Sequence, residues 1–430
     1  MQKGKRKISL DLESTELQIR SSMHQVGSQL LESLVNSDDG GHQGTTLMIE
    51  GKEKGRFVEY RKKKVMTVLG SITIKRAYYY DKKEKVGCIP KDQKLDIEGT
   101  SFSPGVRRMI GRVGAYRPFA LGQSDLEELA GIAVTSKEVE RYSEESGHEM
   151  DDFFQKESAC ALSPENVIPI KKVPIMYVSM DGTGVPVVKR ETANRVGRGE
   201  AGQSKTREAK LGCVFTQTKV DSQGRPVRDE FSTTYVGAIE TADEFSKRIY
   251  GEAVRRGMVT VGKVCILGDG ARWIWNIADE QFYEAIQIVD LYHAREHYWN
   301  VAKVAFDGDR ETQQQWADQC RKELDQGNVE KVINVIRLLP STTTQQKELF
   351  DKEANYFNNN KDRMRYKKFR EQGLFVGSGV MEAGCRTLVG QRLKQSGMHW
   401  AVEGANGIIA LRCALLSNRW EDFWESRIAS

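Results

Sequence analysis

Three acidic residues, far apart along the chain, lie at predicted strand ends and near a predicted helix start, positions where metal-dependent enzymes often carry their ligands. Asp181 follows an apolar run at 173–180 and precedes Gly-Thr-Gly, and Asp269 follows a second apolar run at 263–268. Glu382 lies near the start of a predicted helix. Carboxylates at neighbouring strand ends, joined by one from an adjacent helix, are able to hold two divalent ions for phosphoryl chemistry. We therefore expect two Mg²⁺ ions, or Mn²⁺, at these three oxygen-donating residues.

Each acidic residue also has a simpler interpretation. An Asp-Gly pair after a strand most often forms a turn, which applies to both Asp181 and Asp269. Glu382 has Arg386 four residues later, so the two also fit a helical ion pair. A haloacid-dehalogenase-type phosphatase is a further alternative, because its Asp-x-Asp-Gly-Thr motif is similar to residues 179–183. Its nucleophilic first Asp is replaced here by Ser179, which argues against that enzyme class.

The elements around these residues follow a definite order. Three β-rich runs, at 173–180, 211–218 and 231–236, are succeeded by an alternation of helix and strand: a helix at 241–257, a strand at 263–269, a helix through Trp273 and Trp275, and a strand at 285–290. Three sequential strands suit an antiparallel meander, and the later alternation requires parallel crossovers. The order predicts an α/β RNase H-like catalytic domain. Helical sequence at 300–372 predicts an all-α insertion, and helices at 379–395 and 402–418 close the chain.

The N-terminal third is predicted to bind DNA. It holds a helical arm around 14–36, a small β-hairpin from the runs 56–60 and 65–80, and a helix-turn-helix-like pattern at 124–142. Lys137 and Arg141 lie on the second helix of that pattern, which in a true helix-turn-helix enters the major groove. An ordinary helical hairpin has the same pattern, so DNA reading stays an open alternative here.

Five regions are therefore expected. They are an N-terminal arm and β-hairpin region at 1–100, a helical DNA-binding domain at 101–163, the first part of the catalytic domain at 164–299, the all-α insertion at 300–372 and the C-terminal catalytic helices at 373–430.

Four sequence blocks carry a resemblance to a known family. They begin at Asp181 (Asp-Gly-Thr-Gly-Val-Pro), Gly268 (Gly-Asp-Gly-Ala-Arg-Trp-Ile-Trp), Asp290 (Asp-Leu-Tyr-His-Ala-Arg-Glu-His) and Gly377 (Gly-Ser-Gly-Val-Met-Glu-Ala). Together with the tail from 392 to 425, they resemble the signature blocks of Kra-type insertion-sequence transposases, DDE enzymes of the Mutator-like superfamily. The resemblance implies that Asp181, Asp269 and Glu382 are the catalytic triad. It also implies that Asp290 and His293 lie beside the active site; for His293 the alternative is a histidine that faces the sheet and has its own hydrogen-bond partners.

The resemblance has one departure. Related sequences carry closely paired cysteines after the tyrosine run, whereas this chain has only Cys88 there. A metal-bound knuckle in that region is therefore not expected. The seven cysteines include no Cys-x-x-Cys pair, which argues against zinc fingers and a disulfide framework.

Basic residues give candidate contacts to double-stranded DNA. The net charge of +5 is too small to indicate DNA binding by itself, so the prediction depends on where the basic residues lie. A basic loop follows Asp181, and further cations lie in the C-terminal blocks; the candidates are Lys189, Arg190, Arg195, Arg198, Lys205, Arg207, Arg386, Arg392 and Lys394. A second basic run at 361–370 equally fits a solvated helix face.

The sequence as a whole predicts a DNA transposase. It would hydrolyse the phosphodiester at the terminal inverted repeats and transfer the 3′-hydroxyl into target DNA, as a homodimer or higher oligomer. Its 39% hydrophobic and 29% charged residues exclude a membrane-spanning or low-complexity chain, so we expect a cytoplasmic, nucleoid-associated protein. The alternatives are a catalytically silent, sequence-specific DNA-binding protein derived from a transposase, and a nuclease that cuts without joining.

Overall fold

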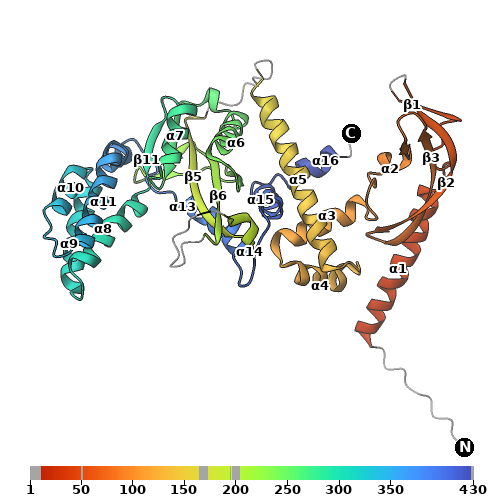
Figure 1. Ribbon diagram of the computed structural model, residues 1–430, viewed down its shortest axis with the longest axis horizontal. Coiled ribbons are helices and arrows are strands. Elements are labelled where there is room, and N and C mark those ends of the chain that lie inside the picture. Colours follow the sequence, from red (N-terminus) through yellow and green to blue (C-terminus); the bar gives the residue numbers. More distant parts are fainter. Residues whose placement is uncertain (1–10, 50–51, 164–172, 194, 196–203, 428–430) are drawn as a thin grey trace, which may run out of the picture. The chain divides into compact units, whose positions relative to one another are not determined.

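The computed structural model describes residues 11–49, 52–163, 173–193, 195 and 204–427. The chain divides into two compact units, Met1–Ser143 and Glu144–Ser430. Helix α5 (Ser136–Ala161) begins in the first unit and ends in the second (Figure 1). The predicted boundaries at 100 and 163 therefore do not coincide with this division.

The first unit contains a larger sheet than the predicted hairpin. Four antiparallel strands pair in sequence order: β1 (Thr46–Ile49), β2 (Lys52–Thr67), β3 (Gly70–Asp81) and β4 (Val86–Cys88). The hairpin prediction was wrong in extent because β1 and β4 are too short to stand out in sequence, and they form by pairing with the edges of the long β2–β3 ribbon. Helix α1 (Leu12–Val35) packs on β3, with Leu31 and Val35 against its apolar residues.

Short helices complete the first unit. They are α2 (Pro90–Lys94), α3 (Pro104–Tyr116) and α4 (Phe119–Ala130). Gly131 ends α4 in the left-handed conformation, at φ +66°. Thr135 and Glu138 then exchange hydrogen bonds at the start of α5, the reciprocal pattern of a capping box. A core around Val106, Ile110 and Leu126 holds α3, α4 and the start of α5 together.

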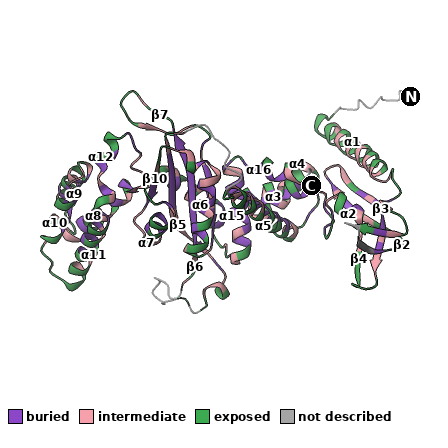
Figure 2. Cartoon of the chain, turned by 90° about the horizontal axis from the view of Figure 1, so that it is seen from above, coloured by how far each residue is buried: buried purple, intermediate pink, exposed green. Residues whose placement is uncertain are grey.

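A five-stranded mixed sheet forms the centre of the second unit. Its spatial order is β11 (Ile286–Val289), β10 (Lys263–Gly268), β5 (Ile175–Pro186), β6 (Thr206–Gln217) and β9 (Thr234–Ala238). Strands β5, β6 and β9 are antiparallel, whereas β10 and β11 run parallel to β5. The expected meander followed by parallel crossovers is therefore present. The central strands are mostly buried (Figure 2).

One sheet prediction was wrong in detail. Asp181 does not end its strand: β5 continues to Pro186, paired throughout with β6. Only the parallel partner β10 stops earlier, at Gly268. The Asp-Gly-Thr-Gly sequence has the composition of a turn, but β6 supplies hydrogen-bond partners that keep it extended.

Helices pack around and beyond this sheet. The crossover helices are α6 (Ala242–Arg255), α7 (Arg272–Gln281) and α8 (Leu291–Ala305). The helical region after α8 contains α9 (Arg310–Asp325), α10 (Val329–Arg337), α11 (Thr344–Asn360) and α12 (Tyr366–Glu371), so its predicted helical character is confirmed. The closing helices are α13 (Gly379–Cys385), α14 (Gln391–Leu393), α15 (Val402–Leu416) and α16 (Trp420–Ser426). Short elements fill the connections: β7 (Lys219–Val220), β8 (Pro226–Val227), η2 (Lys189–Thr192), η3 (Met258–Thr260) and η4 (Lys361–Met364).

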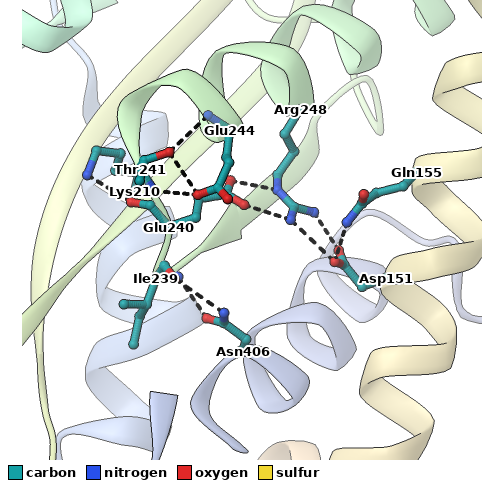
Figure 3. A network of polar contacts seen from close by, with 9 residues as sticks. All are labelled: Asp151, Gln155, Lys210, Ile239, Glu240, Thr241, Glu244, Arg248 and Asn406. Atoms are coloured by element: carbon teal, nitrogen blue, oxygen red, sulfur yellow. Dashed lines mark hydrogen bonds and ion pairs between the residues drawn. The ribbon is translucent and has the colours of Figure 1, made fainter. Parts of the chain in front are cut away.

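A largely buried polar network joins α6 to α5 (Figure 3). Arg248 donates two hydrogen bonds to Glu240, at 2.8 and 2.9 Å, and another to Asp151 at 2.5 Å. The predicted capping box of α6, formed by Thr241 and Glu244, lies beside it. Two carboxylates share one guanidinium here, so removing Arg248 would leave both without their main partner.

Candidate functional site

Asp181 and Asp269 occupy neighbouring positions on two parallel strands. Ser179 of β5 lies opposite Leu267 of β10, and each Asp lies two residues further along its chain. Adjacent strands are about 4.8 Å apart, so the two half-buried carboxylates come close together. The register thus brings the two residues to neighbouring positions, and their catalytic role stays a prediction.

The environment of Asp181 disfavours its charge. Burial, the largest cause, and the negative charge of Asp269 both raise the pKa of Asp181. The thiol of Cys385, the Gly182 amide and the charge of His293 oppose this rise without cancelling it. The Gly182 N–H donates to Asp181 Oδ1 at 2.7 Å. A cation near the two carboxylates would stabilise the ionised form of Asp181.

Asp269 is held by a tight turn at the end of β10. Its Oδ1 accepts a hydrogen bond from the Ala271 amide at 2.8 Å, and its carbonyl accepts one from the Tyr356 hydroxyl at 2.9 Å. Gly270 has φ +101°, and a Cβ there would lie 2.6 Å from the Tyr356 ring. The turn interpretation of this Asp-Gly pair is therefore correct, and it is compatible with a site at Asp269.

Glu382 lies on the first turn of α13, which packs on β5. Its side chain is exposed and has no hydrogen bond or ion pair, so the alternative Glu382–Arg386 pair is absent from the described structure. Cys385, one turn later, contacts Asp181 instead, at 3.1 Å between Sγ and Oδ2. Across the described parts of the chain, no group of three or more His, Cys, Asp or Glu is arranged to hold a metal ion.

Sequence reasoning missed Cys385. It lies three residues after Glu382, the spacing that puts two side chains on neighbouring turns of one helix face. That spacing could have indicated that Cys385 lies on the same side of the helix as Glu382. A π-helical turn, η5 (Arg386–Gly390), follows α13 directly. Such turns shift the helix face by one residue and are frequent at functional sites.

Asp290 connects the sheet to the α13 segment. It is 5% exposed, and its Oδ1 accepts the His293 amide at 2.7 Å, which caps α8. Its Oδ2 accepts the amide of Ser378, the residue before α13. His293 itself is partly exposed and lies 3.5 Å from Glu296. Asp290 thus joins the first turn of α8 to the residue before α13.

Most predicted basic contacts of the second unit are on the surface. Lys189, Arg190, Arg195, Lys205 and Arg386 are exposed, whereas Arg198 lies outside the described residues.

The remaining three cations differ in exposure. Arg207 is half-buried and donates to the Glu191 carbonyl at 3.3 Å. Lys394 is exposed and donates to Thr183 Oγ1 at 2.6 Å, two residues along β5 from Asp181.

Arg392 does not lie on the surface. Its side chain is completely buried, with the guanidinium carbon 5.0 Å from the centre of the Trp400 ring. Burial lowers the pKa of Arg392 to about 10, with repulsion from Arg412 adding to the effect. The prediction that Arg392 contacts DNA is therefore wrong, because Trp400 and the surrounding helices enclose its side chain. We therefore remove Arg392 from the candidate surface.

In the first unit, Lys137 and Arg141 both project into solvent from the first turns of α5. Arg141 lies over the Tyr142 ring, at 4.5 Å from its centre. The two helices and the glycine-ended turn between them occupy the predicted positions. Whether they read DNA stays a prediction.

A cavity of about 390 Å³ lies elsewhere in the second unit. It is bordered by Tyr235, Glu240, Arg248, Cys413 and Arg419, and none of the three predicted catalytic carboxylates lines it. We place the candidate site at the carboxylates, because the cavity holds no comparable convergence of unpaired charge.

None of the described helices is long and apolar enough to cross a membrane.

Comparisons with known proteins add the following findings. Residues 6–197 match an uncharacterised protein family, UPF0236. No curated protein matches the chain. Among solved structures, the chain is similar to the Drosophila P element transposase strand transfer complex at 9% identity, with a TM-score of 0.25, covering 79% of this chain and 84% of that one. At this identity and TM-score, the similarity assigns no function to this chain.

Proposed function

We propose that this protein is a DDE-type DNA transposase of the Kra-type insertion-sequence group. The observation that carries the proposal is the neighbouring position of Asp181 and Asp269 at the end of the parallel ladder, where burial and the charge of Asp269 raise the pKa of Asp181. The strand order, an antiparallel meander followed by two parallel strands, is the order expected of an RNase H-like catalytic domain. Its substrate would be the double-stranded DNA of terminal inverted repeats and targets.

The two neighbouring aspartates carry the kind of donor atom that divalent ions take, although no three such residues are gathered around one point in the described structure. Asp181 and Asp269 supply the oxygen ligands that Mg²⁺ and Mn²⁺ prefer, and Glu382, exposed and unpartnered, would be the third ligand. When bound, two such ions lower the pKa of the attacking hydroxyl and stabilise the leaving oxygen. Asp290 would hold α13 against the sheet through Ser378.

The surrounding cations would hold the DNA. Lys394 lies beside Thr183, and Lys189 and Arg190 follow the end of β5, so phosphates approaching the carboxylates would meet positive charge. Lys137 and Arg141 would contact DNA from the first unit. Two or more copies would be required to hold two element ends.

A catalytically silent DNA-binding protein is the second candidate. The observation that favours it is the position of Cys385, which occupies the place beside Asp181 that a third carboxylate would need. A nuclease that cuts without joining has the same carboxylates, so geometry alone does not separate it from a transposase.

The test uses purified full-length chain and end-labelled duplexes made from the DNA flanking its gene. Mg²⁺, Mn²⁺ or EDTA is added, and products are resolved on denaturing gels. Nicked and joined products support the transposase, nicks alone support the nuclease, and shifted but uncut DNA supports the silent binder. Asp181→Asn, Asp269→Asn and Glu382→Gln should each abolish cleavage while leaving DNA binding intact. Full cleavage by any of them removes that residue from the site.

A further inference from the structure

Helix α1 carries a row of exposed apolar side chains, which Thr15 and Glu16 interrupt between its first two members. Each member is between 55% and 68% exposed, which is unusual for large apolar residues on one helix. We call this row the apolar stripe: Leu12, Ile19, Met23, Val26, Leu30 and Leu34. No residue of the helix is fully buried. The stripe is therefore a surface that the first unit leaves uncovered.

The helix is held in place by a different face. Glu32 Oε2 accepts the Thr73 amide at 2.7 Å, and Asn36 Oδ1 accepts the Lys75 amide at 2.8 Å, on the free edge of β3. Leu31 packs against the core of the sheet. At 100° per residue, this face lies about half a turn away from the stripe. The stripe is thus free to contact a partner without displacing the helix.

The spacing of the stripe indicates what that partner is. Successive members lie seven, four, three, four and four residues apart, so the central part alternates between four and three as in a coiled-coil seam. Such a seam is complementary to a second copy of itself. If each side chain loses roughly 100 Å², two helices together bury about 1,200 Å², the lower bound of a stable, specific interface.

We infer that α1 pairs with α1 of a second copy of this chain through the apolar stripe. The inference goes beyond the proposed function and does not depend on it, because pairing needs neither DNA nor metal. A second copy buries the stripe along its full length, whereas a smaller ligand leaves most of it exposed.

The first test measures the mass of the full chain by sedimentation equilibrium at micromolar concentrations without DNA. The wild type should be a dimer, and Met23→Glu/Leu30→Glu should weaken dimerisation at least a hundredfold. Gln18→Glu/Gln25→Glu adds the same charge to the opposite face of the same helix and should leave the dimer intact. A monomeric wild type, or equal masses for all three proteins, overturns the inference.

A second test does not depend on the folding of the charged variant. Met23 is at the midpoint of the stripe, so it meets its counterpart in either a parallel or an antiparallel in-register pair. Met23→Cys should form a cross-linked dimer under mild oxidation. Gln25→Cys on the opposite face should not exceed the background of the seven native cysteines. Equal cross-linking at both positions contradicts pairing through the stripe.

A separate observation concerns the β2–β3 ribbon of the first unit. Strand alternation divides the run Arg61–Lys64 between two faces. Lys63 turns inward, donating to the Ile97 carbonyl at 2.6 Å. Lys62 turns outward, directly opposite Lys75 of β3. Both are exposed, as is Lys64, and none of the three is paired with a carboxylate in the described structure.

Like charges directly opposite each other destabilise a sheet, so the outward lysine face has a cost within the free chain. Lys75 partly offsets it by lying over the Tyr60 ring, at 3.9 Å from the centre. A polyanion would remove the repulsion. A two-stranded ribbon also has the width that the DNA major groove admits.

We propose that Lys62, Lys64 and Lys75 contact the backbone of duplex DNA. This proposal rests on the proposed function for the identity of the polyanion. Binding of a fluorescent duplex to the full chain is measured against salt concentration. Lys62→Gln/Lys64→Gln/Lys75→Gln should weaken binding by on the order of tenfold and reduce the salt slope by about two to three.

The matched control is Lys303→Gln/Lys347→Gln/Lys352→Gln, three exposed lysines of α8 and α11. It should retain the wild-type affinity and slope. If the control and the ribbon variant behave alike, the ribbon proposal fails while DNA binding stands. If the wild type binds no duplex, the proposed function fails with it.

Discussion

The thiol of Cys385 donates a hydrogen bond to Asp181 Oδ2 across 3.1 Å. Burial, the largest cause, and the Asp181 charge both raise the pKa of Cys385, so the thiol stays protonated and serves as a neutral donor. This contact links the catalytic-helix candidate α13 to the central strand β5. It also places a cysteine where the sequence suggested a carboxylate.

The first prediction concerns the reactivity of Cys385. In the native protein at pH 8 it should alkylate much more slowly than exposed Cys160, because only the thiolate reacts. Asp181→Asn removes the negative charge that disfavours the thiolate, so alkylation of Cys385 should accelerate a few-fold. Peptide mapping by mass spectrometry after timed iodoacetamide treatment measures both sites. An unchanged rate in Asp181→Asn would contradict the contact.

The second prediction concerns metal binding. Mn²⁺ or Mg²⁺ should raise the melting temperature of the wild type, because an ion that binds only the folded chain stabilises it by about 2.7 kcal/mol at a hundred times its dissociation constant. Asp181→Asn and Asp269→Asn should lose most of that increase. Asp279→Asn, on α7, is the control and should retain it. Calorimetry with and without the ion measures the difference, and equal increases in all variants would exclude this site.

The third prediction concerns Gly270. Alanine there is strained by the positive φ and meets the Tyr356 ring at 2.6 Å, so unfolding free energy should fall by about 2–3 kcal/mol. Gly308 has a similar φ of +82° with no atom within 4 Å of an added Cβ. Gly308→Ala should therefore cost only about 1 kcal/mol. Urea unfolding measures both; equal losses would mean that the Tyr356 contact has no effect.

The fourth prediction concerns Arg248. Arg248→Ala leaves Glu240 and Asp151 without the guanidinium that joins them, and it should destabilise the second unit by about 3 kcal/mol. Lys247→Ala, at the exposed neighbouring position, should change stability by less than about 0.5 kcal/mol. Thermal unfolding compares the two. A neutral Arg248→Ala would show that the network does not stabilise the unit.

The fifth prediction concerns pH. The Arg365 guanidinium, 2.6 Å from Glu330, lowers the pKa of Glu330 from 4.5 to about 2. A lowered carboxyl pKa stabilises the folded state above the unfolded pKa, so this contribution is complete above pH 4.5 and is lost as pH falls toward 2. Because the pair is largely exposed, Glu330→Gln should cost at most about 1 kcal/mol at pH 7.

Urea midpoints of wild type and Glu330→Gln, compared at pH 7 and pH 3, check this expectation. The difference between the two proteins should shrink at the lower pH. A difference that stays constant with pH would mean that the effect of the substitution is not electrostatic.

Local features of the chain could be predicted from the sequence. The Thr241 and Glu244 capping box, the apolar run that becomes β10 and the glycine-ended turn at Gly131 each depend on residues close together in the chain. Their physical causes are capping, periodicity and backbone conformation, which sequence records directly. The order of strands and helices followed from the same signals.

Long-range relationships needed the tertiary structure. The sequence could not show that β6 keeps Asp181 within a strand, that Trp400 encloses Arg392, or that Cys385 rather than Glu382 contacts Asp181. Each depends on which distant segment supplies the neighbouring atoms. Local propensity does not encode that choice, because packing between elements decides it. The sequence by itself thus determined the elements and the acidic residues that they carry, and only the tertiary structure decided which of those residues meet.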